Sequence, residues 1–208
     1  MTDLLLSMDS ALFTFLNGTL GNPLFDVVMP VITDLNRHWY GWVLIGGAWV
    51  LLIVRGGRVG RTAALLVIPV IVISDQVSSS LLKKLIMRPR PCHAIGGLPV
   101  EEHIRLLVDC GGGFSFPSSH AVNNFAAAML LSHFYPRRRM ALFFVAGIVA
   151  FSRISVGVHY PSDVLGGMLV GMLVAAVCIL GWMLVVAYYP GLDPLAPPDA
   201  KDLPGPPR

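Results

Sequence analysis

The chain has 208 residues, of which 55% are apolar and only 13% are charged, and its formal net charge is +3. Soluble globular domains carry about 25% charged residues, whereas the mean hydropathy of this chain is +0.70. This composition excludes an ordinary soluble domain. It indicates an all-α, polytopic membrane helix bundle, and the length suits one domain.

The first 35 residues are apolar but interrupted, first by Asn17-Gly18 and then by Gly21-Asn22-Pro23. Neither half reaches the roughly 20 apolar residues that a membrane-spanning helix needs. We therefore expect two short amphipathic helices that lie at the membrane interface or re-enter the bundle. A single broken span is the alternative.

Five longer apolar runs follow, and we expect each to form a membrane span: 39–54, 62–82, 118–134, 140–156 and 164–189. A long polar loop, 83–116, separates the second span from the third, and a short turn, 159–163, separates the fourth from the fifth. Residues 1–189 are expected to form the membrane-embedded domain. Residues 190–208 are rich in Pro and Asp, which predicts a disordered cytoplasmic tail.

Two short loops, 55–61 and 137–139, are rich in Arg, and such loops remain in the cytoplasm. This topology places the 83–116 loop and the 159–163 turn together on the outer side. The outer loop nevertheless carries several cations, namely Lys83, Lys84, Arg88, Arg90 and Arg105. Anion binding would explain them, and for Lys84 and Arg88 we expect contacts with lipid headgroups.

Polar clusters mark the outer ends of these spans, where ionisable side chains are rare and indicate functional sites. Lys83, Arg90 and Arg153 are cations, and Arg side chains bind phosphoryl oxygens in a bidentate manner. Ser118 and Ser119 stand at the start of a predicted helix, where free N–H groups and the helix dipole favour an anion. The three cations and this helix start predict a phosphate site.

Two imidazoles accompany the predicted phosphate site. Asp163 follows His159 by four residues and can reach it on a helical turn. A histidine oriented by a carboxylate suits a nucleophile or base, and the second histidine, His120, suits a proton donor. We find no Cys, His or carboxylate cluster with metal-ligand spacing. The pattern predicts metal-independent phosphoryl transfer with no cofactor.

Three segments, Lys83-x6-Arg90-Pro91, Pro117-Ser118-Ser119-His120 and Ser152-Arg153-x5-His159-x3-Asp163, carry a family resemblance. In order and internal spacing they resemble the three-part signature of the type 2 phosphatidic acid phosphatase (PAP2) superfamily. The surrounding helix pattern extends the resemblance over most of the chain. The family also contains soluble vanadium haloperoxidases, but this chain is similar to the membrane branch.

The resemblance implies a role for each signature residue. His159 would attack phosphorus and form a phosphohistidine, Asp163 would hold its tautomer, and His120 would protonate the leaving oxygen. The phosphate oxygens would be bound by Lys83, Arg90, Arg153 and Ser118, and by the backbone N–H groups of Ser119 and His120. The family usually has Gly at position 119. The Ser119 side chain would either crowd the phosphate or give it a further hydrogen bond, while the backbone N–H is retained.

The resemblance also implies a lipid phosphate or diphosphate as substrate, met at the outer leaflet of a bacterial inner (plasma) membrane. The active site would face the periplasm or the cell exterior. The short loops resemble those of undecaprenyl diphosphate phosphatases, which release undecaprenyl phosphate for cell wall biogenesis. Lipid A phosphatases and phosphatidylglycerophosphate phosphatases share the motifs. A non-catalytic lipid-phosphate binding or transport protein is an alternative of a different class. No nucleic-acid partner is expected, and the oligomeric state stays open.

Three details of the outer side have alternatives. Cys92 and Cys110 are expected to form a disulfide in an oxidising compartment, with two free thiols as the alternative. Asn123 and Asn124 either bond across helices or line the pocket. The candidates to orient His120 are Glu101, Glu102 and Asp109.

Overall fold

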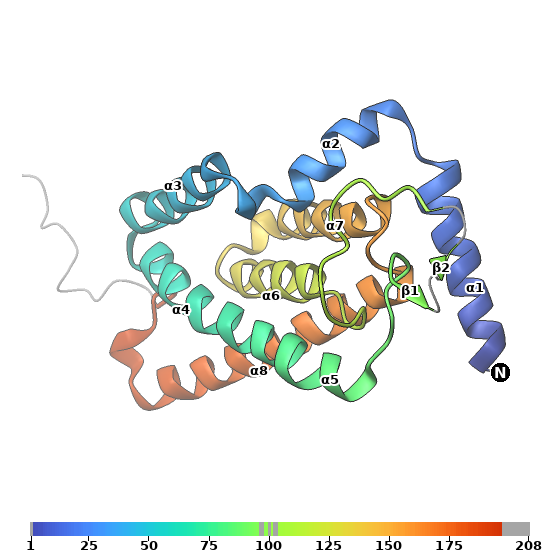
Figure 1. Ribbon diagram of the computed structural model, residues 1–208. Helices are drawn as coiled ribbons and strands as arrows, with labels where there is room; N and C mark the ends of the chain where they lie inside the picture. Colours follow the sequence, from blue (N-terminus) through green and yellow to red (C-terminus); the bar gives the residue numbers. More distant parts are fainter. Residues whose placement is uncertain (1, 96–97, 100, 102–103, 197–208) are drawn as a thin grey trace, which may run out of the picture.

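The computed structural model describes residues 2–95, 98–99, 101 and 104–196, and it is almost entirely helical (Figure 1). Its α-helices are α1 (Thr2–Thr14), α2 (Pro23–Thr33), α3 (Trp39–Arg55), α4 (Gly57–Asp75), α5 (Lys83–Ile86), α6 (Ser119–Phe134), α7 (Arg139–Ser155) and α8 (Pro161–Tyr188). Shorter helical pieces are π-helical at Phe15–Thr19 and Gln76–Leu82, and 3-10 at Leu35–Arg37, Pro136–Arg138 and Pro190–Leu192. Two short strands, β1 (Ala94–Ile95) and β2 (Leu98–Pro99), pair antiparallel in the outer loop.

The predicted helices are present, but two boundaries were wrong. The second apolar segment is helical from Gly57 to Ile86, so Lys83 lies on a helix rather than in the loop. The last helix begins at Pro161, so Asp163 belongs to its first turn rather than to a connecting turn. Proline is favoured at the first helical position, where its missing N–H has no partner to lose. Both errors arose because polar residues were equated with loops.

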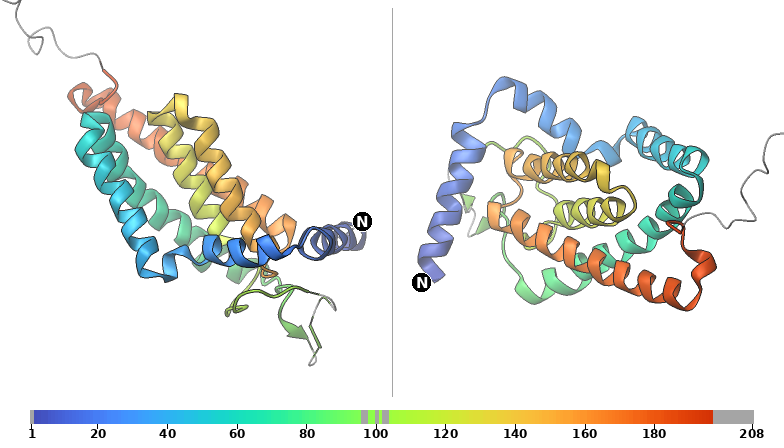
Figure 2. Two further views of the ribbon diagram at one scale, coloured as in Figure 1. Left: turned by 90° about the horizontal axis from the view of Figure 1, so that it is seen from above. Right: turned by 180° about the vertical axis from the view of Figure 1, so that it is seen from behind.

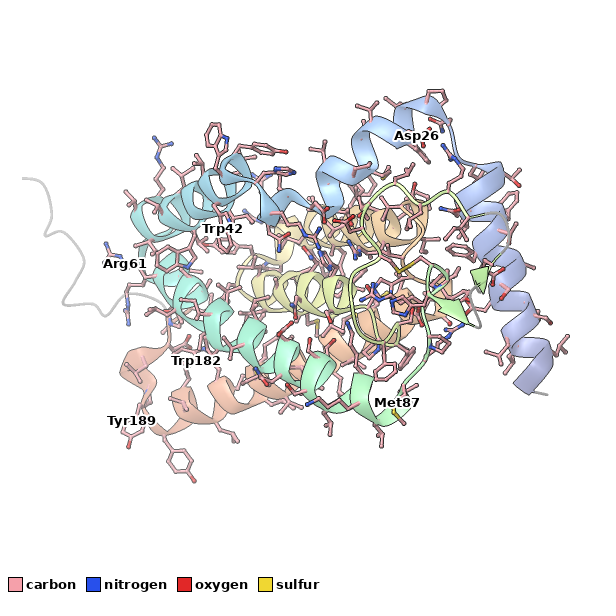
Figure 3. The ribbon with its side chains drawn as sticks, viewed as in Figure 1. Asp26, Trp42, Arg61, Met87, Trp182 and Tyr189 are labelled. Atoms are coloured by element: carbon pink, nitrogen blue, oxygen red, sulfur yellow. A yellow bond between two sulfur atoms is a disulfide. The ribbon has the colours of Figure 1, made fainter. Side chains whose placement is uncertain are left out.

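The five long helical segments lie side by side, with α6 at the centre (Figures 1 and 2). α6 packs against α8, α7 and α4, whereas α3 packs mainly against α4. Figure 3 labels Arg61 and Tyr189 at one end of this bundle and Met87 and Asp26 at the opposite end. The Arg-rich turns and the polar outer loop are therefore at opposite ends, as the topology required.

The first half of α8 buries small side chains against the bundle and exposes large ones. On α8 the inward positions follow a spacing of four and are Gly167, Gly171 and Ala175, while Leu165, Leu169 and Leu173 are exposed. Small residues at this spacing let helix backbones approach closely in a membrane. A Cβ atom at Gly171 would lie 2.1 Å from the carbonyl oxygen of Val122 on α6. This close packing fixes the start of α6 against the start of α8.

The N-terminal residues form two helices, as expected, and these lie across the end of the bundle (Figure 2). The Asn17-Gly18 interruption is an anchor, because Asn17 is buried and its Nδ2 donates to the carbonyls of Arg105 (3.0 Å) and Ser155 (2.9 Å). The Arg105 side chain pairs with Asp26 near the start of α2. The N-terminal segment is thus joined to the outer loop and to the end of α7.

Two helical stretches, Gly57–Ile86 and Pro161–Tyr188, are long and apolar enough to cross a membrane by themselves. The helices α3, α6 and α7 have 17, 16 and 17 residues. At about 1.5 Å per residue, these helices extend roughly 24–26 Å, somewhat less than the hydrocarbon thickness of about 30 Å. Residues 190–192 form a 3-10 turn whose Gly191 carbonyl accepts from Arg58 at 2.8 Å. The rest of the predicted tail, 197–208, lies outside the described residues.

Candidate active site

The three sequence motifs meet at the end of the bundle where α6 begins and α7 ends. Figure 3 shows side-chain nitrogen atoms gathering there, next to the loop that carries the disulfide. Arg90 Nη1 lies 3.5 Å from His159 Nε2, which joins the first motif to the third. The Ser118 N–H donates to the Asp163 carbonyl at 3.0 Å, which joins the second motif to the third. The structure therefore brings the predicted site residues together.

His159 is 1% exposed and has different partners at its two ring nitrogens. Nδ1 lies 3.5 Å from Asp163 Oδ2, whereas Nε2 faces Arg90. The pKa of His159 is lowered to about 4, mainly by burial and also by the charges of Arg90 and Arg153, although the hydrogen bond with Asp163 acts in the opposite direction. The imidazole is therefore neutral at neutral pH. With Asp163 accepting from Nδ1–H, the lone pair lies on Nε2.

The Asp163 carboxylate is fully buried and accepts from several donors. Oδ2 accepts from the backbone N–H of Tyr160 at 2.8 Å and from Ser115 Oγ by a short hydrogen bond. Oδ1 accepts from Arg88 Nη1 at 2.8 Å. Donors of this kind favour the ionised carboxylate. Sequence reasoning missed Ser115, which lies in a Gly-rich stretch, outside the three motifs.

Three cations cluster beside His159, with Arg90 at its Nε2 and with Arg153 and Lys83 close to Arg90. Arg90 is buried, and its Nε donates to the Gly113 carbonyl at 3.3 Å. Arg153 is also buried; its Nη1 donates to Thr33 Oγ1 at 2.7 Å, and its Nε has no partner within the described residues. Lys83 lies within electrostatic range of both. Within the described part of the chain none of the three forms an ion pair, and buried cations without a counter-charge are costly unless an anion binds.

The start of α6 leaves backbone donors open. Ser118 is the N-cap, but its side chain makes no capping hydrogen bond, and its buried Oγ has no partner among the described residues. The first N–H groups of a helix have no partner within the helix. The Ser119 hydroxyl instead pairs with Ser78 Oγ at 2.8 Å. The added side chain at position 119 therefore points toward the neighbouring helix, and only its backbone N–H remains available to an anion.

His120 follows on the same turn and is only partly buried. It lies within electrostatic range of Arg153, His159 and Lys83. Of the carboxylates considered for orienting it, Glu101 instead accepts from the Tyr160 hydroxyl at 3.2 Å. Asp109 has no hydrogen bond to it in the described residues, and Glu102 lies outside them. Asn123 bonds across helices, donating to Asp75 at 3.3 Å, while Asn124 bonds back to the His120 carbonyl at 2.9 Å.

The outer loop is closed by a disulfide between Cys92 and Cys110, as expected, with Cα atoms 5.9 Å apart. The expectation that Arg88 contacts lipid headgroups was wrong, because its guanidinium is directed inward to Asp163 and Asp9. Lys84 is exposed, which suits a headgroup contact. Within the described residues, no group of three or more His, Cys, Asp or Glu side chains is placed to hold a metal ion.

Comparison with known proteins gives consistent matches. Residues 64–186 match the PAP2 superfamily. The chain is 28% identical to a lipid A 4'-phosphatase of Bacteroides thetaiotaomicron over 82% of this chain and 75% of that protein. It is 31% identical to a decaprenylphosphoryl-5-phosphoribose phosphatase of Mycobacterium tuberculosis, over 70% of this chain and 74% of that protein.

Solved structures agree. The crystal structure of Aquifex aeolicus LpxE superposes with a TM-score of 0.63 at 28% identity and covers 81% of this chain and 93% of its own. A phosphatidylglycerolphosphate phosphatase from Bacillus subtilis shares the fold, with a TM-score of 0.63 at 24% identity, over 93% of this chain and 90% of its own. The matched segment spans more than half of the chain and contains all three motifs. The chain therefore belongs to the PAP2 superfamily and is a membrane enzyme of the lipid-phosphatase type.

Proposed function

We propose that this enzyme removes phosphate from a lipid phosphate or diphosphate without a metal ion, through a phosphohistidine at His159. One observation carries the proposal: the two ring nitrogens of His159 have partners of opposite charge. Asp163 faces Nδ1, and the cationic pocket of Arg90 faces Nε2. An imidazole whose proton is fixed on one nitrogen presents the lone pair of the other to an electrophile.

The first half-reaction forms a bond between Nε2 and phosphorus and breaks the bond between phosphorus and the lipid oxygen. The ring gains positive charge as this happens, and Asp163 balances it. His120 would give its proton to the leaving oxygen. This half-reaction releases the lipid that has lost the phosphoryl group and leaves a phosphohistidine on the enzyme.

The second half-reaction returns the enzyme to its starting state. His120, now neutral, takes a proton from water, and the water oxygen bonds to phosphorus while the Nε2–P bond breaks. Inorganic phosphate leaves. Lys83, Arg90 and Arg153 would bind the equatorial oxygens in both steps, together with the Ser118 hydroxyl and the Ser119 and His120 backbone N–H groups. Donors directed at oxygens that gain charge stabilise the transition state.

We further propose five membrane spans, α3, α4 continuing to α5, α6, α7 and α8, with the site facing the periplasm or the cell exterior. The Arg-rich turns at the end opposite to the site support this orientation. The disulfide in the outer loop supports it too, because disulfides persist in oxidising compartments. α1 and α2 would lie at the outer membrane interface.

For the substrate, undecaprenyl diphosphate in an inner membrane remains our first candidate, on the strength of the short loops. The relatives above are named for other lipids, a lipid A phosphate and a decaprenylphosphoryl phosphoribose. What all three lipids share is a terminal phosphoryl group on a membrane lipid. We propose this shared chemistry as the substrate class and treat the individual lipids as outcomes of the test.

The test measures phosphate release in detergent with EDTA from undecaprenyl diphosphate, lipid A and phosphatidylglycerophosphate. Wild type is compared with His159→Ala and with His93→Ala, a loop histidine that bonds to the Gly111 carbonyl at 3.0 Å. We expect release by wild type and His93→Ala and none by His159→Ala. Full activity of His159→Ala, or a strict need for added divalent metal, would reject the mechanism, and the rank of the three lipids would identify the substrate.

A further inference from the structure

Arg88 occupies one of the unspecified positions of the first signature segment, yet it contacts the carboxylate that faces His159. Its Nη1 donates to Asp163 Oδ1 at 2.8 Å, and its Nη2 donates to Asp9 Oδ2 at 2.6 Å. We propose that Arg88 is a positioning residue for the Asp163–His159 pair and that Asp9, from α1, holds Arg88 in place. This inference rests on the proposed function of that pair.

The two oxygens of Asp163 are divided between Arg88 and the histidine. Oδ1 accepts from Arg88, while Oδ2 lies toward His159 and accepts from Ser115 and from the Tyr160 N–H. Arg88 therefore holds the carboxylate from the side away from the imidazole. The carboxylate cannot rotate without losing an ion pair, so Oδ2 stays directed at Nδ1.

The backbone of Arg88 supports a second donor to the same carboxylate. Met87 ends α5 in a left-handed conformation, with φ 49, and this turns the chain back toward the bundle. The carbonyl of Arg88 then accepts from the Ser115 N–H at 2.7 Å. One residue thus fixes Asp163 Oδ1 by its side chain and, through Ser115, Oδ2 by its backbone.

Asp9 completes the arrangement from a distant part of the chain. Its Oδ1 accepts from the Ser162 N–H at 2.9 Å, in the first turn of α8, where a carboxylate is favourable. The guanidinium of Arg88 lies 4.2 Å over the Tyr160 ring. Burial lowers the pKa of Arg88, but Asp163 and Asp9 outweigh burial and raise it, so the guanidinium stays charged.

The charge of Arg88 should also set the pH dependence of the pair. Among the described residues, the other titratable or charged groups within electrostatic range of the pair are Lys83, Arg90, His120, Arg153 and Tyr160. Asp9 contacts Arg88, and Glu101 contacts Tyr160. Without Arg88, Asp163 interacts more strongly with protonated His159. The reactive state, neutral His159 beside ionised Asp163, would then be lost at a higher pH. The acidic limb of activity is therefore expected to move upward.

The experiment follows phosphate release in detergent micelles from whichever of undecaprenyl diphosphate, lipid A and phosphatidylglycerophosphate the wild type hydrolyses fastest. For Arg88→Gln we expect kcat to fall about 100-fold, because a small misplacement near the reacting atoms has an effect of this order. We expect the acidic limb of kcat/KM to rise by about one pH unit. KM and inhibition by inorganic phosphate should stay unchanged, since Arg88 does not bind the phosphate. Ionisation of the substrate affects all variants equally, so it cancels when the kcat/KM of a variant is divided by that of wild type at the same pH.

Arg105→Gln is the matched control, because Arg105 is also a loop arginine that pairs with an N-terminal aspartate, Asp26, but does not contact Asp163. It should leave the pH profile unmoved. Asp9→Asn should lower kcat less than Arg88→Gln, and the double variant should lose no more than Arg88→Gln alone. Arg88→Lys, which keeps the charge, should restore the acidic limb.

Several results would overturn the proposal. If Arg88→Gln and Arg105→Gln have the same kcat and the same pH profile, Arg88 only holds the N-terminal helix against the bundle and does not position Asp163. A loss confined to KM and phosphate inhibition would make it a phosphate ligand. If Arg88→Gln does not fold, a wild-type kcat in Asp9→Asn rejects the idea, because this variant removes the partner that holds Arg88 in place. Full activity of His159→Ala would instead reject the proposed function, and this result does not depend on the Arg88 variants.

Discussion

Ser115 offers the sharpest test of how Asp163 is held. It is fully buried, its hydroxyl donates to Asp163 Oδ2, and the same oxygen lies 3.4 Å from His159 Nδ1. Ser115→Ala removes one donor and leaves the rest of the site in place. A hydrogen bond to a charged group contributes about 1.5–3 kcal/mol. The imidazole gains charge only as the N–P bond forms, so the loss should fall mainly on the transition state.

If the whole contribution is lost in the transition state, kcat falls about 10-fold to 150-fold. The assay measures kcat and KM for phosphate release in detergent, with thermal unfolding to confirm the fold. Ser132→Ala is the matched control, since Ser132 is a buried serine on α6 that donates to the Met129 carbonyl at 2.8 Å, away from the site. A folded Ser115→Ala with the kcat of wild type would refute this account of Asp163.

The remaining predictions concern pH and packing. Because the pKa of His159 is lowered to about 4, its protonation should reduce kcat only as the pH falls through about 4, rather than near the ordinary value of 6.5. Because this pKa is lower in the folded state, the unfolded state binds more protons between pH 4 and 6.5. The free energy of unfolding in detergent should therefore decrease as the pH falls from 6.5 to 4, and a constant value over this range would contradict the prediction. Gly171→Ala should lower the free energy of unfolding by about 1–3 kcal/mol through overpacking, whereas Gly181→Ala on the same helix, with nothing within 4 Å, should not.

Much of the fold could be predicted because its signal is local. Apolar runs identified the helices, and the interruption at Asn17 separated the two N-terminal helices. The helix ends were less certain, since a polar residue can extend a helix as readily as end it. Lys83 continues a helix although it is charged, and Pro161 begins one. In both cases the polar residues indicated the position of the candidate site, whereas the helix boundary became clear only from the backbone structure.

The clustering of the signature residues could be predicted because their spacing places them at neighbouring helix ends. His159 and Asp163 share one turn at the start of α8, and Ser118 and His120 share the start of α6. Their supporting residues could not be found in this way. Ser115 and Arg88 reach Asp163 across 48 and 75 residues of sequence. No local pattern marks such contacts, and an arginine in an outer loop is equally compatible with a lipid headgroup.

The N-terminal segment supplies contacts to the candidate site that the five long helical segments do not provide. Helix ends that open on one side of a bundle lack packing there, and a phosphate site needs fixed donors. Asp9 on α1 contacts Arg88, and Thr33 at the end of α2 accepts from Arg153 at 2.7 Å. Asn17 between them bonds to the end of α7. These contacts hold Arg88 in the loop after α5 and Arg153 and Ser155 at the end of α7. The two N-terminal helices therefore support the candidate site from outside the five long helical segments.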